Sequence, residues 1–287
     1  MSYDYTGNAA KLLSLGEIGT FGAWRDYLKL GLTADDVPEL LRIIDDESLY
    51  DLDLFSAEGW APIHAWRALG QLRAAEAAEP LTKLLNRIET DDDDYAIEDI
   101  PTALAMIGTP ALAPLMTVVG DRDAPESVRS AAIRAIAGAV QTDDEHRAEI
   151  VHFLAEVLDR HEPERAVNAY LVDALVDLRA IEAASSMEAA FDANVVALDL
   201  LGDWETVQVA LGLLDKRITP KPSSWLRAEA VASGRLDSDD ELAWPDVADD
   251  QGDAAKEAAD KERRRKARKA EKSARKQQRA KKKKKRK

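Results

Sequence analysis

The strongest constraint on this chain is a helical periodicity that returns at regular intervals between residues 33 and 214. Apolar side chains recur there at three- and four-residue spacing, as in an amphipathic α-helix, and no stretch sustains the alternation of a β-strand. Four apolar stretches can be aligned on an Ala-Leu or Ala-Ile pair, and the second members of these aligned pairs are Leu69, Leu104, Ile136 and Leu175. Their spacing of 35, 32 and 39 residues predicts an array of helical hairpins, because one hairpin cannot cover its own apolar face.

We therefore expect an all-α fold, a right-handed α-solenoid of about five helix pairs over residues 33–217. Residues 1–32, which include Trp24, are expected to supply capping helices that seal the N-terminal edge of the array. An acidic connector should follow over residues 218–255, and a Lys/Arg-rich, largely disordered tail over residues 256–287. The apolar fraction of the chain, 46%, is sufficient for a packed core in such an array.

One copy of the repeat carries a recognisable pattern. The stretch Asp121–Ala132 places an Asp-rich turn before Val-Arg-x-Ala-Ala, and in this it resembles HEAT repeats, specifically the HEAT-like repeats of the phycobilisome-lyase type. Another copy, Ile100–Ala103, lacks the Arg. Starts like those of a tetratricopeptide repeat at Trp66 and an ankyrin repeat at Ala61–Ala65 each occur once, which favours the HEAT-like interpretation. The resemblance implies a scaffold whose second helices line a concave face.

Charge is divided unevenly along the chain. The formal net charge is −15, but residues 256–287 carry 19 Lys or Arg and 4 Asp or Glu, a net charge of +15. The preceding 255 residues carry 20 basic and 50 acidic residues, a net charge of −30. An acidic body with a basic end predicts an interaction tail. The Ala, Lys, Arg and Glu of that tail are good helix formers, so we expect transient helix there, as in a coiled-coil or disordered C-terminal segment.

The tail is the clearest functional feature of the sequence. Its basic clusters can neutralise phosphates, which predicts salt-sensitive contact with nucleic acid, ribonucleoprotein or another polyanion. Anionic lipid and the acidic body of the same chain are the alternatives, and no apolar face accompanies the charges to give stable membrane insertion. The expected polyanion-binding residues are Arg263, Arg264, Arg265, Lys266, Arg268, Lys269, Lys281, Lys282, Lys283, Lys284, Lys285, Arg286 and Lys287.

A second expected site is a surface on the second helices that holds a protein or peptide partner. Trp60 and His64 are four residues apart and so share a helix face. The alternative is that the Trp rings fill gaps between repeats while His64 bonds a carbonyl group. The expected partner-binding residues are Trp60, His64, Arg67, Arg129 and Asn168.

The sequence points away from several kinds of chemistry. Cys is absent, which excludes disulfides, thiol catalysis and Cys-ligated metals. His146, Glu149 and His152 lack the spacing of a metal pair on one helix face, and Asp91–Asp94 lack the pattern of a calcium-binding loop. No phosphate-binding loop or nucleophile elbow is present. We expect no catalytic residues, no metal site and no cofactor.

The leading functional hypothesis is a non-enzymatic binding scaffold with a concave face for a partner and a tail for a polyanion. One alternative is an enzyme or enzyme accessory similar to the bilin lyases. Another is a structural protein whose tail folds back on its acidic body. No apolar run approaches the length of a membrane helix, and the N-terminus lacks a signal pattern, so we expect a cytoplasmic protein. The oligomeric state is left open.

Overall fold

The computed structural model describes residues 3–18, 24–52, 54–90, 94–141 and 144–221. They lie within one compact unit, Met1–Leu226, and a second unit, Arg227–Lys287, falls outside them. The described residues form α-helices and short 3-10 helices, with no β-strand among them, which confirms the prediction of an all-α protein for this part of the chain.

The α-helices, in chain order, are α1 (Val37–Asp45), α2 (Glu47–Tyr50), α3 (Ala61–Gln71), α4 (Ala78–Leu84), α5 (Arg87–Thr90), α6 (Asp94–Ile107), α7 (Leu112–Gly120), α8 (Glu126–Val140), α9 (Asp144–Leu158), α10 (Arg165–Asp177), α11 (Ala184–Asp192), α12 (Leu198–Leu201) and α13 (Trp204–Ala210). The 3-10 helices are η1 (Ala9–Ser14), η2 (Leu28–Leu30), η3 (Ala34–Asp36), η4 (Glu58–Trp60), η5 (Ala75–Ala77), η6 (Thr109–Ala111) and η7 (Ile181–Ala183).

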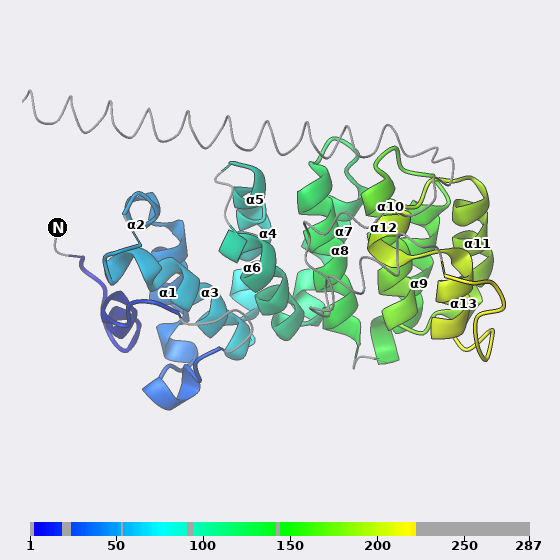
Figure 1. Cartoon of the computed structure of the whole chain (residues 1–287). Helices are drawn as coiled ribbons and strands as arrows, with labels where there is room; N and C mark the ends of the chain where they lie inside the picture. Colours follow the sequence, from blue (N-terminus) through cyan, green and yellow to red (C-terminus); the bar gives the residue numbers. More distant parts are fainter. Residues whose placement is uncertain (1–2, 19–23, 53, 91–93, 142–143, 222–287) are drawn as a thin grey trace, which may run out of the picture. The chain divides into compact units, whose positions relative to one another are not determined.

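The longer helices pack in pairs that follow the chain (Figure 1). The first helix of each pair lies against the second: α1 against α3, α4 against α6, α7 against α8 and α9 against α10. The second helices also contact one another in sequence, α3 with α6, α6 with α8, and α8 with α10. Beyond them α11 contacts α9, and α12 contacts α10. One buried apolar core runs through all of these contacts, as the shared core of stacked hairpins requires.

Small residues set the distance between the second helices. A Cβ atom placed on Gly70 of α3 would lie 2.8 Å from the Cα atom of Ala103 in α6. A Cβ atom on Gly138 of α8 would lie 2.8 Å from the Cβ atom of Ala105, also in α6. Both separations are below any normal carbon contact, so only glycine lets the neighbouring backbones come so close.

The turns after α3 and α10 are copies of each other in sequence and in conformation. Each contains Leu-Arg-Ala, and Arg73 and Arg179 both have a φ of 51° in the left-handed region. The N–H groups of Ala74 and Ala180 reach back to carbonyl groups five residues earlier, at 3.1 and 2.9 Å. This is the hydrogen-bond pattern of a Schellman motif with arginine at the position that glycine usually fills. The turn after α6 has Gly108 there.

The N-terminal segment, for which we expected capping helices, contains no α-helix among its described residues. Its described residues form only the 3-10 helices η1 and η2. Gly7, Gly16 and Gly31 have φ values of 63°, 66° and 90°, in the left-handed region, and Gly31 is the C-cap of η2. Residues of η1 nevertheless pack against α3, so the segment does cover the first pair of helices.

Among the described residues, no single helix is long and apolar enough to cross a membrane. The stretches Tyr95–Ile107 and Thr109–Gly120 meet the length and composition criteria only when taken together, with a bend of 118° between them.

Candidate functional site

The second helices present equivalent positions on one face. In each, the Ala of the Ala-Leu or Ala-Ile pair is buried, and the residues four before, one before and three after that Ala lie on one side of the helix. We call this set the second-helix face. Its members are His64, Arg67 and Gln71 of α3; Asp99, Thr102 and Met106 of α6; Ala131, Arg134 and Gly138 of α8; and Tyr170, Asp173 and Asp177 of α10.

The first part of this face consists of His64, Arg67 and Gln71 of α3 and Asp99 of α6. These residues lie beneath the N-terminal segment, and we call them the covered half. Arg67 is fully buried and forms a bidentate ion pair with Asp99. Its Nε donates to Oδ2 at 2.9 Å and its Nη2 donates to Oδ1 at 3.2 Å. The indole N–H of Trp24 donates to the same carboxylate at 3.1 Å, and the Arg67 guanidinium lies 5.3 Å from the centre of the Trp24 ring. Burial raises the pKa of Asp99, while its bonds to Arg67 oppose that shift.

The backbone of the N-terminal segment is held from both sides of Asp26. The side-chain amide of Gln71 accepts from the N–H of Tyr27 and donates to the carbonyl of Arg25, both at 2.8 Å. Tyr27 is fully buried, and its hydroxyl group lies 2.6 Å from Nδ1 of His64. The covered half therefore binds a short piece of polypeptide through the side chains of Gln71 and His64.

The protonation of His64 follows from its two partners. Nε2 lies 2.8 Å from the carbonyl oxygen of Gly16, which can only accept, so Nε2 must carry the proton. Nδ1 is then free to accept from the hydroxyl of Tyr27. Burial, with smaller contributions from the charges of Arg25 and Arg67, lowers the pKa of His64 to about 4. His64 is thus a neutral group that fastens the N-terminal segment to α3.

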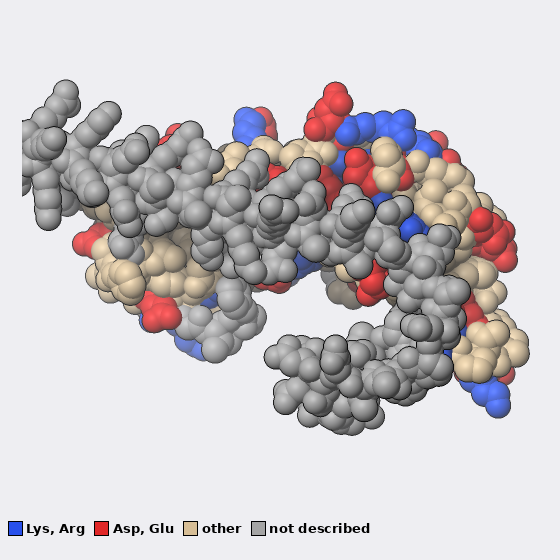
Figure 2. Space-filling view, turned by 45° about the horizontal axis from the view of Figure 1, so that its top comes forward, with Lys and Arg blue, Asp and Glu red and all other residues tan. Residues whose placement is uncertain are grey.

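The open half of the second-helix face is formed by α8 and α10. It surrounds a solvent-open hollow of about 390 Å³. The hollow is lined by Glu98, Arg134, Ala137, Gly138, Gln141, Tyr170, Asp173, Ala174 and Asp177. Figure 2 shows acidic and basic side chains lying next to one another across the described surface in view. In the hollow the balance is negative, because its lining holds three carboxylates and one guanidinium.

The carboxylates of the hollow are incompletely neutralised. Nη2 of Arg134 lies 3.3 Å from Oε2 of Glu98, in a pair that is 35% and 54% exposed. Asp173 and Asp177 lie one turn apart on α10, where like charges repel. Burial and then the charge of Asp177 raise the pKa of Asp173, and Arg134 opposes this shift. A cation in the hollow would remove the repulsion, so the site is suited to a positively charged ligand.

Residues 33–217 match the family described as "Protein of unknown function (DUF1186)". The chain belongs to this family. No curated protein and no solved structure matches the chain. The family segment contains every helix that lines the hollow, whereas the residues that cover α3 precede it.

The structure does not place the predicted partner-binding residues on a surface. Trp60 is 6% exposed, His64 1%, and Arg67, Arg129 and Asn168 are 0% exposed. The prediction that these five form a partner-binding face is therefore wrong. The N-terminal segment covers His64 and Arg67, and the indole N–H of Trp60 donates to a loop carbonyl, that of Leu54, at 2.7 Å.

Arg129 and Asn168 bind backbone and side-chain groups at helix ends and in the loops beside them. They occupy equivalent positions in α8 and α10, six residues before the aligned Ala. Arg129 donates to the carbonyl of Val119 through Nε and Nη2, at 3.2 and 3.0 Å, and to Oε2 of Glu162 at 3.0 Å. Asn168 donates to the carbonyl groups of Glu162 and Val195, at 2.7 and 2.9 Å. Both side chains thus satisfy backbone groups that would otherwise be buried without partners.

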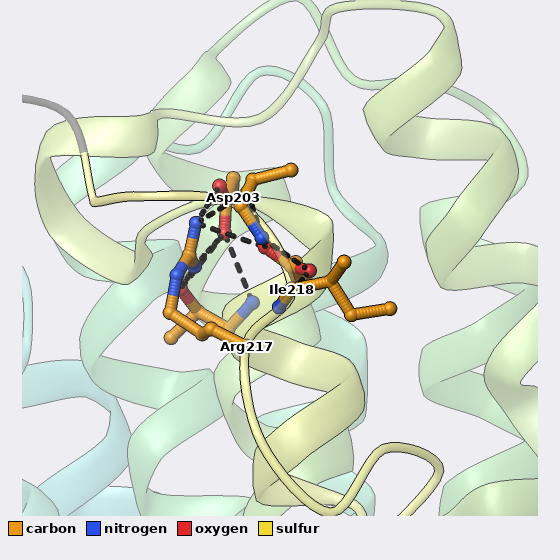
Figure 3. A network of polar contacts seen from close by, with 6 residues as sticks. Asp203, Arg217 and Ile218 are labelled. Atoms are coloured by element: carbon orange, nitrogen blue, oxygen red, sulfur yellow. Dashed lines mark hydrogen bonds and ion pairs between the residues drawn. The ribbon is translucent and has the colours of Figure 1, made fainter.

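A polar clamp closes the family segment at its C-terminal end (Figure 3). Arg217 donates to both oxygens of Asp203, at 2.6 and 2.7 Å. Asp203 also accepts the N–H of Thr206 at 2.9 Å and so caps α13. Glu205 accepts the N–H of Ile218 at 2.6 Å. The bonds from Arg217 lower the pKa of Asp203 to about 2, and the clamp holds the returning chain against the start of α13.

The remaining expectations concern metal ions and the tail. Within the part of the chain that the structure describes, no three His, Cys, Asp or Glu side chains gather as a metal site. His152 is 76% exposed and lies beside Glu156 on α9. Residues 91–93 of the acidic run lie outside the described residues. So do all the expected polyanion-binding residues, Arg263, Arg264, Arg265, Lys266, Arg268, Lys269 and Lys281–Lys287.

The residues of the hollow were missed from the sequence, although the signal for them is present there. Arg67 and Arg134 each stand directly before an aligned Ala, and Asp173 stands at the same position of α10. Extending the repeat alignment by one residue in each copy selects these charged side chains. The alignment does not tell which of them the N-terminal segment covers, because that depends on contacts between distant parts of the chain.

Proposed function

We propose that this chain is a non-enzymatic binding scaffold in which HEAT-like helix pairs form a right-handed α-solenoid. The open half of the second-helix face holds a protein or peptide partner. Support for the solenoid comes from the contacts of α3, α6, α8 and α10, each of which packs against the next in chain order. A stack with this connectivity produces an extended surface along its second helices.

The observation that carries the proposal is the hollow over α6, α8 and α10. It opens to solvent and has carboxylates on two of the three helices, Glu98 on α6 and Asp173 and Asp177 on α10. Catalytic and cofactor sites usually enclose most of a small ligand, whereas a charged hollow that opens to solvent suits a segment of polypeptide. The bilin-lyase-like alternative would require the polar groups of the hollow to act on a bound small molecule.

The basic tail adds a second contact in this proposal. Its net charge of +15 over residues 256–287 favours nucleic acid or another polyanion, with a strong dependence on salt. A cytoplasmic location accompanies this function. The contact at the hollow uses carboxylates and the contact of the tail uses Lys and Arg side chains, so a variant can remove either contact and leave the other.

The test is a pull-down with three forms of the full protein and one tail deletion. The Asp173→Asn/Asp177→Asn variant should lose a protein partner and keep polyanion binding. Deletion of residues 256–287 should do the reverse, measured with and without nuclease at two salt concentrations. The control is Glu145→Gln/Glu149→Gln, an equal charge change one turn apart on α9, the first helix of the pair that α10 completes. If the hollow variant and the control retain the same proteins, the proposed site is wrong.

A further inference from the structure

We propose that the hollow over α6, α8 and α10 binds an extended basic segment of another protein and takes one Lys or Arg side chain of that segment between Asp173 and Asp177. This inference rests on the proposed function and specifies its ligand. The covered half of the same molecule provides an internal example of how the second-helix face holds a peptide.

The covered half shows that this face accommodates polypeptide backbone. Gln71 lies three residues after the aligned Ala of α3, and it bonds the backbone of the N-terminal segment at Arg25 and Tyr27. Asp177 occupies the same position of α10. A carboxylate there can accept an N–H group, as the amide oxygen of Gln71 does, or bind a cation. The spacing of the helices is set by small residues in both halves, at Gly70 and at Gly138.

The charges distinguish what each half can hold. In the covered half the guanidinium of Arg67 is matched by the single carboxylate of Asp99, which leaves room for a neutral aromatic side chain, that of Trp24. In the open half Arg134 lies opposite Glu98, and the described lining of the hollow holds no second basic residue to match the two carboxylates of α10. The missing charge is positive, so a Lys or Arg side chain completes the hollow where Trp24 completes the covered half.

The raised pKa of Asp173 agrees with this assignment. Burial and the neighbouring Asp177 make its negative charge costly in the free protein. A bound cation offsets the cost of burial and weakens the repulsion from Asp177, because it supplies an opposite charge within hydrogen-bonding distance. The carboxylates are thus arranged for a cationic partner before that partner arrives.

The test measures binding of short Gly/Ser peptides to the full chain by titration calorimetry. One peptide carries a central Arg, and its control carries citrulline, which has the same shape without the charge. We expect the Arg peptide to bind and the citrulline peptide to bind roughly tenfold more weakly, the effect of losing one hydrogen bond between charged groups. The Asp173→Asn/Asp177→Asn variant should lose this preference, and the Glu145→Gln/Glu149→Gln control should keep it.

The control separates the hollow from the general attraction of an acidic body for basic peptides, because both variants remove the same charge. Asp173→Lys/Asp177→Lys should reverse the preference in favour of a peptide with a central Glu. Circular dichroism will show whether each variant keeps its helices. Equal binding of Arg and citrulline peptides overturns the inference, as does equal loss in the hollow and control variants. The two proposals can fail separately. If the peptide preference is absent but the Asp173→Asn/Asp177→Asn variant still loses its protein partner in the pull-down, this inference is wrong and the proposed function stands.

Discussion

Arg67 and Arg134 occupy the same position in two helices of the array, yet their surroundings differ completely. Arg67 is buried against Asp99 under the N-terminal segment, and Arg134 forms a partly exposed pair with Glu98 at the edge of the hollow. The covered half and the open half therefore use equivalent positions for different purposes. In one, charge holds the chain's own segment in place, and in the other it remains available to solvent. The neighbours of a residue, more than its place in the repeat, decide its role.

The largest effect expected from this comparison is on the stability of the two arginine sites. Arg67→Met leaves Asp99 buried without its partner and should lower the free energy of unfolding by about 4 kcal/mol. Arg134→Met removes an exposed pair and should lower it by about 0.5 kcal/mol. Urea unfolding of the two variants measures both values. Similar losses at the two positions would show that the covered half is no more buried in solution than the open half.

The second prediction concerns the pH dependence of the covered half. The pKa of His64 is lowered to about 4, so the folded protein resists protonation there while the unfolded chain accepts a proton near pH 6.5. Stability should be full above pH 6.5 and fall by about 3 kcal/mol as the pH drops towards 4. Urea unfolding across this range measures the slope.

The matching variants are His64→Gln and His152→Gln. The first should flatten the slope between pH 6.5 and 5, and the second should leave it unchanged because His152 is largely exposed. A slope that persists in His64→Gln would assign the titration to another group and contradict the buried, neutral state of this histidine.

The third prediction concerns the glycines that set the helix spacing. Gly70→Ala and Gly138→Ala should each cost about 2 kcal/mol, because the added methyl group overlaps a neighbouring helix. Ala105→Gly should relieve Gly138→Ala, since the overlap there is with a side-chain carbon. Ala103→Gly should not relieve Gly70→Ala to the same extent, since the backbone Cα of residue 103 remains in the way. Double-mutant cycles measure the difference, and equal relief at both sites would contradict the close backbone approach of α3 to α6.

The helical nature of the chain could be predicted from its sequence because apolar spacing is a local property. The aligned pairs that contain Leu69, Leu104, Ile136 and Leu175 are all buried in second helices. The contents of the site could not be predicted in the same way. Trp60 and His64 are aromatic residues at helical spacing, but their exposure depends on loops and on residues about fifty positions earlier in the chain. Periodicity shows which side of a helix faces the core, and it contains no information on what covers the other side.

Gln71 binds the N-terminal segment through its backbone, so a side chain of that segment can be replaced by a probe. It bonds backbone atoms on both sides of Asp26, while the side chain of Asp26 is 47% exposed and pairs with Lys29. The sequence contains no cysteine, so an Asp26→Cys protein would carry a single thiol that can be labelled without side reactions. A fluorescent dye at that position would sit beside the contacts without replacing any atom that Gln71 holds. It would turn detachment of the segment from α3 into an optical signal that can be followed in real time.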